Sequence, residues 1–104
     1  MNDPQFGLKA EFVQMLQAVF AKFPTVEKVI LYGSRAKGNY KPGSDIDLVI
    51  MGEKADLSMR LAIESEIDDL LLPYKVDLSI YRDIENPDLK DHIQRVGKVF
   101  FEVV

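Results

Sequence analysis

Residues 33–47 read GSRAKGNYKPGSDID and join two segments that are rich in β-branched and other apolar side chains. The segment before them, residues 26–32, reads VEKVILY and predicts a buried strand. The segment that overlaps their end, residues 46–51, predicts a second strand. Glycine, proline, asparagine and basic residues fill the connection, which predicts a loop with one helical turn near residues 34–37. A connection this short allows the two strands to pair antiparallel.

Three amphipathic segments flank these strands and predict helices. Residues 8–23 carry apolar side chains at the spacing of one helix face. Residues 56–71 follow a similar spacing, and Asp56 is a candidate N-cap. A last helix follows Asn86, another candidate N-cap, and ends at Gly97.

Two further strands complete the prediction. Residues 75–81 alternate between polar and apolar side chains and predict a third strand, while residues 99–104 predict a short edge strand. The resulting order is α-β-(α)-β-α-β-α-(β), which predicts an α/β fold with a small mixed β-sheet flanked by helices. Because a helix joins the second and third strands, we expect them to form a right-handed parallel pair.

Length and composition narrow the possible classes of protein. A chain of 104 residues predicts a single domain over residues 1–104. A formal net charge of −4 argues against an extensive nucleic-acid-binding surface. The absence of cysteine and the presence of one histidine, His92, exclude disulfides, thiolate zinc sites and clusters of histidine ligands. We expect His92 and the four tyrosines to serve packing rather than catalysis.

The chain carries no recognisable targeting or membrane segment. Residues 1–5 lack the basic and apolar regions of a signal peptide. No apolar run approaches the roughly 20 residues that span a bilayer. We therefore expect a cytoplasmic protein without a membrane partner.

Three aspartates lie near the predicted ends of strands. Asp45 and Asp47 are two residues apart where the second strand begins, so their carboxylates point to the same side of the sheet. Asp77 lies near the start of the third strand, and parallel pairing would bring it level with Asp47. Like charges repel unless a cation lies between them, and oxygen ligands favour Mg²⁺ or Mn²⁺ over Zn²⁺. The three carboxylates therefore suit two metal ions that stabilise the attacking and leaving oxygens of a phosphoryl transfer.

The loop before these aspartates has the features of a phosphate-binding segment. Gly33 and Ser34 follow a strand and precede a helical turn, so that backbone N–H groups can face an anionic ligand. Glycine lets the backbone approach a phosphate closely, and the serine hydroxyl adds a donor. Arg35, Lys37 and Lys41 add positive charge to an otherwise acidic chain. We expect a polyphosphate to bind here, with Arg35 and Lys37 as candidate contacts.

Each of these residues also has a purely structural interpretation. Gly33 and Gly38 could be ordinary turn glycines. Ser44 and Asp45 could cap a turn before the strand, and Asp77 could lie on the exposed face of an edge strand. The combination of a glycine loop with three carboxylates near strand ends favours a functional site.

The same residues resemble the signature of the minimal nucleotidyltransferase (MNT) family of the DNA polymerase beta-like superfamily. That signature, G-S-x-A-x-G followed by S-D-x-D, is matched at residues 33–38 and 44–47. The resemblance continues through residues 76–78 and 97–99 and so covers nearly the whole chain. It implies a polymerase beta-like fold and metal-dependent transfer of a nucleoside monophosphate from a nucleoside triphosphate to a hydroxyl group, with pyrophosphate leaving.

The resemblance also implies a role for each matched residue. Asp45 and Asp47 match the metal-binding pair of the family. Asp77 matches a third carboxylate that binds metal and helps to deprotonate the attacking hydroxyl. Gly33 and Ser34 match the loop that contacts phosphate. The implied ligands are ATP as substrate and Mg²⁺ as cofactor, with two ions bound and Mn²⁺ as an alternative.

The family resemblance further implies a protein partner. MNT proteins look like the antitoxin half of a pair whose other half is a HEPN-type helical ribonuclease, and the implied reaction transfers AMP to a tyrosine of that toxin. The chain is too short to include an acceptor-binding domain, so we expect a homo- or hetero-oligomer in which the partner supplies that surface. Two alternatives stay open: an antitoxin that neutralises the toxin by binding alone, and nucleotidyl transfer to a small molecule or to RNA.

Overall fold

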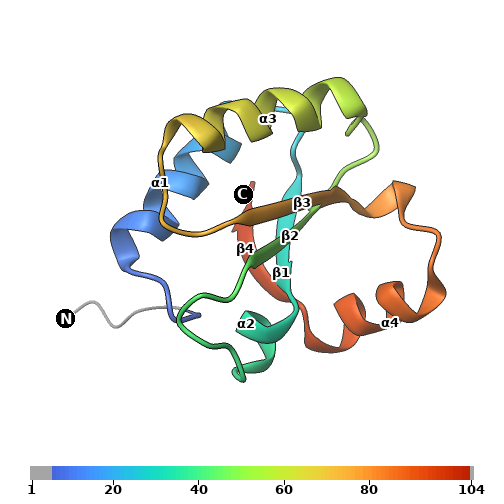
Figure 1. Cartoon of the computed structure of the whole chain (residues 1–104). Coiled ribbons are helices and arrows are strands. Elements are labelled where there is room, and N and C mark those ends of the chain that lie inside the picture. The colour runs from blue at the N-terminus through green and yellow to red at the C-terminus, as the bar shows by residue number, and fades with distance from the viewer. Residues whose placement is uncertain (1–5, 104) are drawn as a thin grey trace.

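The structure is a computed structural model that describes residues 6–103 (Figure 1). It confirms the predicted α/β fold, in which helices flank a small mixed sheet. In chain order the elements are α1 (Ala10–Ala21), β1 (Lys28–Tyr32), α2 (Ser34–Lys37), β2 (Ile46–Met51), α3 (Leu57–Asp69), β3 (Val76–Ile80), the 3-10 turn η1 (Tyr81–Asp83), α4 (Pro87–Val96) and β4 (Lys98–Glu102).

The four strands lie in the order β3-β2-β1-β4. Strand β1 is antiparallel to both of its neighbours, β2 and β4, as the short loop before β2 allows. Strands β2 and β3 are parallel, as expected for two strands joined by a helix. This mixed pairing places the end of β1 at the same end of the sheet as the starts of β2 and β3.

The two faces of the sheet are covered differently. Helices α1 and α3 cover one face and bury the larger apolar cluster, to which Leu48 belongs (Figure 1). Helix α4 packs against the other face, where Ile93 joins a smaller cluster with Tyr32 and Val49. Since alternate residues of a strand point to opposite faces, the side chain of Asp47 shares the α4 face with Val49.

Side-chain caps begin both long helices that follow β2. The carboxylate of Asp56 accepts a hydrogen bond from the Met59 N–H at 2.8 Å and caps α3. The side chain of Asn86 accepts from the N–H groups of Asp88, at 2.9 Å, and Leu89, at 3.4 Å, and caps α4. Both predicted N-caps are therefore confirmed.

The turn between α4 and β4 requires a glycine for steric reasons. A Cβ atom on Gly97 would lie 2.3 Å from the Ile93 carbonyl oxygen and 2.6 Å from a methyl group of Ile30. The end of α4 is therefore pressed against β1, which fixes the position of the helix relative to the sheet.

Strand β4 contains a β-bulge. Its register with β1 shifts between Val29 and Ile30, and Phe100 is the residue of β4 without a direct partner there. The side-chain amide of Gln17 on α1 donates to the Phe100 carbonyl at 2.8 Å. The Phe100 carbonyl is thus directed toward α1 instead of a neighbouring strand.

Some helix and strand boundaries in the structure differ from the predicted ones. Helix α1 begins at Ala10 instead of residue 8, and Leu8 is fully buried in a short β-bridge before it. The last strand runs from Lys98 to Glu102, while Val104, included in the prediction, lies outside the described residues. Residues 1–5, on which the prediction that a signal peptide is absent rests, also lie outside the described residues. Over residues 6–103, no helix has the length and apolarity required to cross a membrane.

Candidate active site

The three aspartates lie at one end of the sheet. Asp47 on β2 is the direct partner of Asp77 on the parallel strand β3. Asp45 comes immediately before β2. Asp47 is half-buried, whereas Asp45 and Asp77 are exposed. The fold therefore brings Asp47 and Asp77 to neighbouring positions on one face and leaves this end of the sheet open to a ligand.

The electrostatic environment of Asp47 is unfavourable to its own negative charge. Burial raises the pKa of the Asp47 carboxyl, and the negative charges of Asp77 and Asp45 raise it further. The charged form of the nearby His92 imidazole would act in the opposite direction. A cation at this position would relieve the repulsion, because it would favour the charged form of every carboxylate around it.

Tyr32 lies beside the same carboxylates. It is the β1 partner of Asp47 and is buried. Burial raises the pKa of the Tyr32 hydroxyl, a hydrogen bond with Ser79 lowers it, and the charges of Asp47 and Asp77 raise it. The hydroxyl therefore stays protonated at neutral pH. Tyr32 packs in the apolar cluster, as the sequence predicts, and also carries its hydroxyl close to the acidic site.

Gly33 connects β1 to α2 directly above Asp47. Its φ of 77° favours glycine, and a Cβ atom would lie 2.3 Å from the Asp47 Oδ2 atom. The Gly33 carbonyl accepts a hydrogen bond from the Lys37 N–H at 3.1 Å and so begins α2. Any side chain at this position would displace the Asp47 carboxylate. The contact with a site residue is therefore one reason why this position requires glycine.

His92 reaches the same place from α4. Its Nε2 atom accepts a hydrogen bond from the Gly33 N–H at 3.2 Å. Its ring packs edge-on against Tyr32, with the ring centroids 6.2 Å apart. The expectation that His92 only packs its helix was therefore incomplete. The available signal was its helical phase, three residues after Leu89 and four before Val96, which turns it toward the sheet.

Arg35 has a different position from the one expected of a phosphate contact. The residue is only 2% exposed, and its guanidinium donates to the backbone carbonyls of Ser44, at 2.9 and 3.1 Å, and Phe6, at 2.9 Å. It also lies over the rings of Tyr40 and Tyr74. Since these groups occupy the guanidinium, the arrangement argues against a direct phosphate contact and makes Arg35 the anchor of the loop.

The other polar residues of the loop are more accessible. Ser34, in the first turn of α2, is half-buried, and Lys37 is exposed. The Ser44 hydroxyl accepts from the Lys41 N–H at 2.8 Å, so Ser44 stabilises the turn before β2. Lys37 is therefore the basic residue of α2 that is free to move toward an anionic ligand.

The donor atoms at this end of the sheet suit a hard divalent cation. Carboxylate oxygens are the ligands that Mg²⁺ prefers, and Asp47 and Asp77 present them from adjacent strands. Among residues 6–103, no three histidine or acidic side chains are arranged to hold one ion by themselves. Mg²⁺ in nucleotide-binding enzymes uses one or two carboxylates together with phosphate oxygens and water. The residues therefore fit an ion that binds together with a nucleotide.

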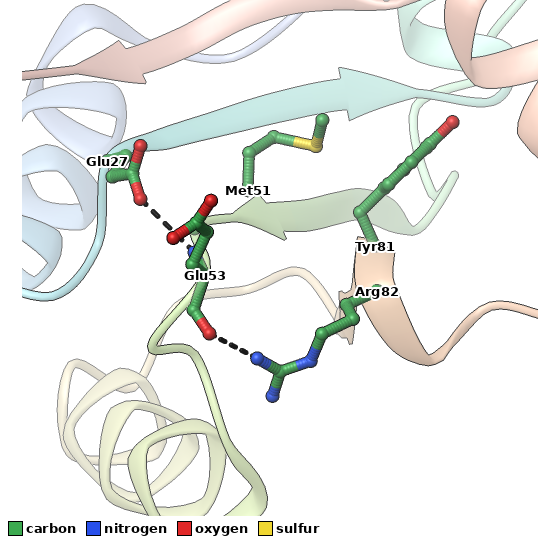
Figure 2. A pocket seen from close by; sticks show the side chains of 6 residues that line it. Glu27, Met51, Glu53, Tyr81 and Arg82 are labelled. Atoms are coloured by element: carbon green, nitrogen blue, oxygen red, sulfur yellow. Dashed lines mark hydrogen bonds between the residues drawn. The ribbon is translucent and has the colours of Figure 1, made fainter.

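A separate cavity of about 320 Å³ lies at the other end of β1 and β2 (Figure 2). Met51 in its wall pairs with Lys28, whereas Asp47 pairs with Tyr32. The cavity is therefore remote from the carboxylates. Its wall includes Glu27, Met51, Glu53, Tyr81 and Arg82.

Comparison with known protein families identifies a match over most of the chain. Residues 14–103 match the family described as "Polymerase beta, Nucleotidyltransferase". The chain is also 28% identical over 99 residues to a Haemophilus influenzae protein named "Probable protein adenylyltransferase MntA", with 94% of this chain and 86% of that protein covered.

Solved structures share the fold. A toxin-antitoxin complex with AMP-PNP contains a chain that is similar with a TM-score of 0.70 at 20% identity, covering 88% of this chain and 73% of that chain. A complex of a tri-AMPylated Shewanella oneidensis HEPN toxin with an MNT antitoxin matches with a TM-score of 0.59 at 20% identity, with the same coverage of 88% and 73%. At this level of identity the likeness concerns the fold.

Proposed function

This chain belongs to the polymerase beta nucleotidyltransferase family, and from that premise we propose that it transfers AMP from ATP to a hydroxyl group of a partner protein. The observation that carries the proposal is the Asp47–Asp77 pair, which faces Gly33 at an open end of the sheet. A nucleotidyl transfer needs carboxylates that hold a metal ion beside a loop that accepts phosphate. Both features meet at this one place in the fold.

Asp45, Asp47 and Asp77 would bind metal together with phosphate oxygens of the nucleotide and water, because no three acidic side chains among residues 6–103 are arranged to hold one ion by themselves. For the metal we propose Mg²⁺, with Mn²⁺ as a substitute. When bound, the metal supplies positive charge that neutralises the triphosphate. In the reaction, the acceptor oxygen forms a bond to the α-phosphorus, the bond from that phosphorus to the bridging oxygen of the β-phosphate breaks, and pyrophosphate leaves. Asp77 is exposed and is the direct β3 partner of Asp47, and in this proposal it takes the proton of the acceptor hydroxyl.

Gly33, Ser34 and Lys37 are the residues that we propose for nucleotide binding. Gly33 lets the chain pass against Asp47 without a side chain, so phosphate and metal can lie close together. Ser34 offers a hydroxyl, and Lys37 offers an exposed ammonium group. Arg35 acts indirectly in this proposal, because its guanidinium holds the loop through Ser44.

We propose a HEPN-type toxin as the partner and a tyrosine of that toxin as the acceptor. The similarity to a protein named as a protein adenylyltransferase supports this choice. So does the likeness of the fold to an MNT antitoxin in complex with a tri-AMPylated HEPN toxin. The need for ATP as substrate also supports the cytoplasmic location that the sequence predicts.

The experiment that tests the function is intact-mass measurement of the partner. The purified chain is incubated with Mg²⁺, ATP and the product of the neighbouring gene, and the expected result is a gain of one or more AMP units on that product. Asp77→Asn should abolish the gain. If the partner is silenced without a mass change, and Asp77→Asn silences it equally, then the protein neutralises its partner by binding alone. Labelling of RNA or of a small molecule instead would identify a different acceptor.

A further inference from the structure

The backbone of Gly33 is in contact with three other residues. Its N–H donates to His92 Nε2 at 3.2 Å, and its carbonyl accepts from the Lys37 N–H at 3.1 Å. Its Cα lies against Asp47, since an added Cβ would come within 2.3 Å of the Oδ2 atom. The Lys37 contact is part of α2, so the hydrogen bond to His92 is the one of the two that comes from a different element of the fold.

His92 is itself firmly placed. The next residue, Ile93, is buried in the cluster with Tyr32 and Val49. Asn86 caps the start of α4, and Gly97 presses its end against Ile30. The imidazole therefore projects from a capped helix that packs on the sheet through Ile93 and lies against Ile30 at its end, and its Nε2 atom is a well-placed acceptor for the loop.

We propose that His92 is a positioning residue of the active site: through its Nε2 atom it fixes the Gly33 peptide and thereby holds the nucleotide-binding loop above Asp47. The inference rests on the proposed function, because the loop binds a nucleotide in that proposal. The imidazole must be neutral, with its proton on Nδ1, for Nε2 to accept the Gly33 N–H. His92 acts through Gly33 and does not touch the reacting atoms.

Two amide substitutions separate hydrogen bonding from packing. In His92→Gln the side-chain oxygen reaches the former position of Nε2, and in His92→Asn the shorter side chain does not. Both variants lose the imidazole ring and its edge-on contact with Tyr32 to the same extent. A difference in ligand affinity between two variants of similar melting temperature therefore reports the acceptor.

The first measurement tests the contact without a ligand. In ¹⁵N-labelled protein we expect an N–N coupling across the hydrogen bond between the Gly33 amide and His92 Nε2, and a ¹⁵N shift that places the imidazole proton on Nδ1. An imidazole with its proton on Nε2 would overturn the proposal, since that nitrogen could not then accept a hydrogen bond.

The second measurement is the affinity for Mg²⁺ with AMP-PNP, determined by calorimetry alongside the melting temperature of each variant. We expect His92→Gln to bind within about twofold of the wild type and His92→Asn to bind about five- to tenfold more weakly, the range for one lost hydrogen bond. Equal affinities of the two variants would overturn the role of His92. A wild-type protein that does not bind AMP-PNP would overturn the proposed function instead, and the coupling measurement would still decide whether His92 fixes Gly33.

Discussion

Asp47 faces Asp77 across the parallel β2–β3 pair, at the end of the sheet that Gly33 covers. Two carboxylates in neighbouring positions repel each other when no cation lies between them. Burial of Asp47 adds to this cost, as the raised pKa of its carboxyl indicates. The folded chain thus carries a local destabilisation at the residues to which we assign metal binding, and this has consequences that can be measured.

Removing one of these charges should stabilise the protein without ligand. Because the folded state raises the pKa of Asp47, its ionised form weakens the fold at neutral pH, and that penalty disappears as the pH falls below the ordinary value of 3.8. We expect Asp47→Asn to raise the free energy of unfolding at pH 7 by roughly 0.2–1 kcal/mol, the scale of a cross-strand pair. Urea unfolding at pH 7 and pH 3 should show the gain only at pH 7.

The same substitution should remove the response to ligand. We expect Mg²⁺ together with AMP-PNP to stabilise the wild type by about 2.7 kcal/mol at a ligand concentration a hundredfold above Kd. Asp47→Asn should lose most of this stabilisation, as measured by thermal unfolding with and without the ligands. A variant that responds as strongly as the wild type would contradict the assignment of Asp47 as a metal ligand.

Gly33 and Gly38 provide a matched pair for the loop. Both have positive φ, of 77° and 88°, but an added Cβ meets Asp47 at Gly33 and nothing within 4 Å at Gly38. Because of the backbone conformation, we expect Gly38→Ala, at a left-handed α position, to cost about 1–2 kcal/mol of stability and Gly33→Ala about 1–3 kcal/mol. Gly33→Ala should also weaken AMP-PNP binding by at least about tenfold, a loss of roughly 1.4 kcal/mol. Calorimetry that finds equal binding by both variants would reduce Gly33 to an ordinary turn residue.

Substitution of Arg35 should mainly lower stability, and substitution of Lys37 should mainly weaken nucleotide binding. We expect Arg35→Ala to lower the free energy of unfolding by about 3 kcal/mol, since it leaves the part-buried carbonyls of Ser44 and Phe6 without donors. Lys37→Ala should change stability by less than about 0.5 kcal/mol, as is usual for an exposed side chain. It should weaken AMP-PNP binding about two- to fivefold, the range for an exposed ion pair. Denaturant unfolding and calorimetry on the two variants separate these effects, and a stable Arg35→Ala variant with weak binding would restore Arg35 as a phosphate contact.

The elements around the site could be predicted from local sequence signals. Strand β2 and the turn α2 have the predicted bounds, because glycines and polar residues limit them on both sides. The caps at Asp56 and Asn86 follow from local hydrogen bonding within one turn. Asp47 and Asp77 are direct partners in the sheet. This pairing was predictable because the connection through α3 makes β2 and β3 parallel.

The roles of Arg35 and His92 could not be predicted in the same way. The burial of Arg35 depends on Tyr74, which lies far along the chain and contacts the guanidinium only in the folded state. The contact of His92 depends on how α4 is rotated and translated against β1. Residue type and spacing along the chain do not contain that tertiary information.

The bulge in β4 has a consequence for solubility. Strand β4 reads KVFFE and lies at the edge of the sheet, and such an apolar edge strand is a template for aggregation when it is flat and unpaired. The register shift at Phe100 interrupts the regular ladder, and Gln17 occupies the Phe100 carbonyl from α1. The bulge and the Gln17 contact therefore make this edge a poorer template for a further strand than a flat, regular edge would be.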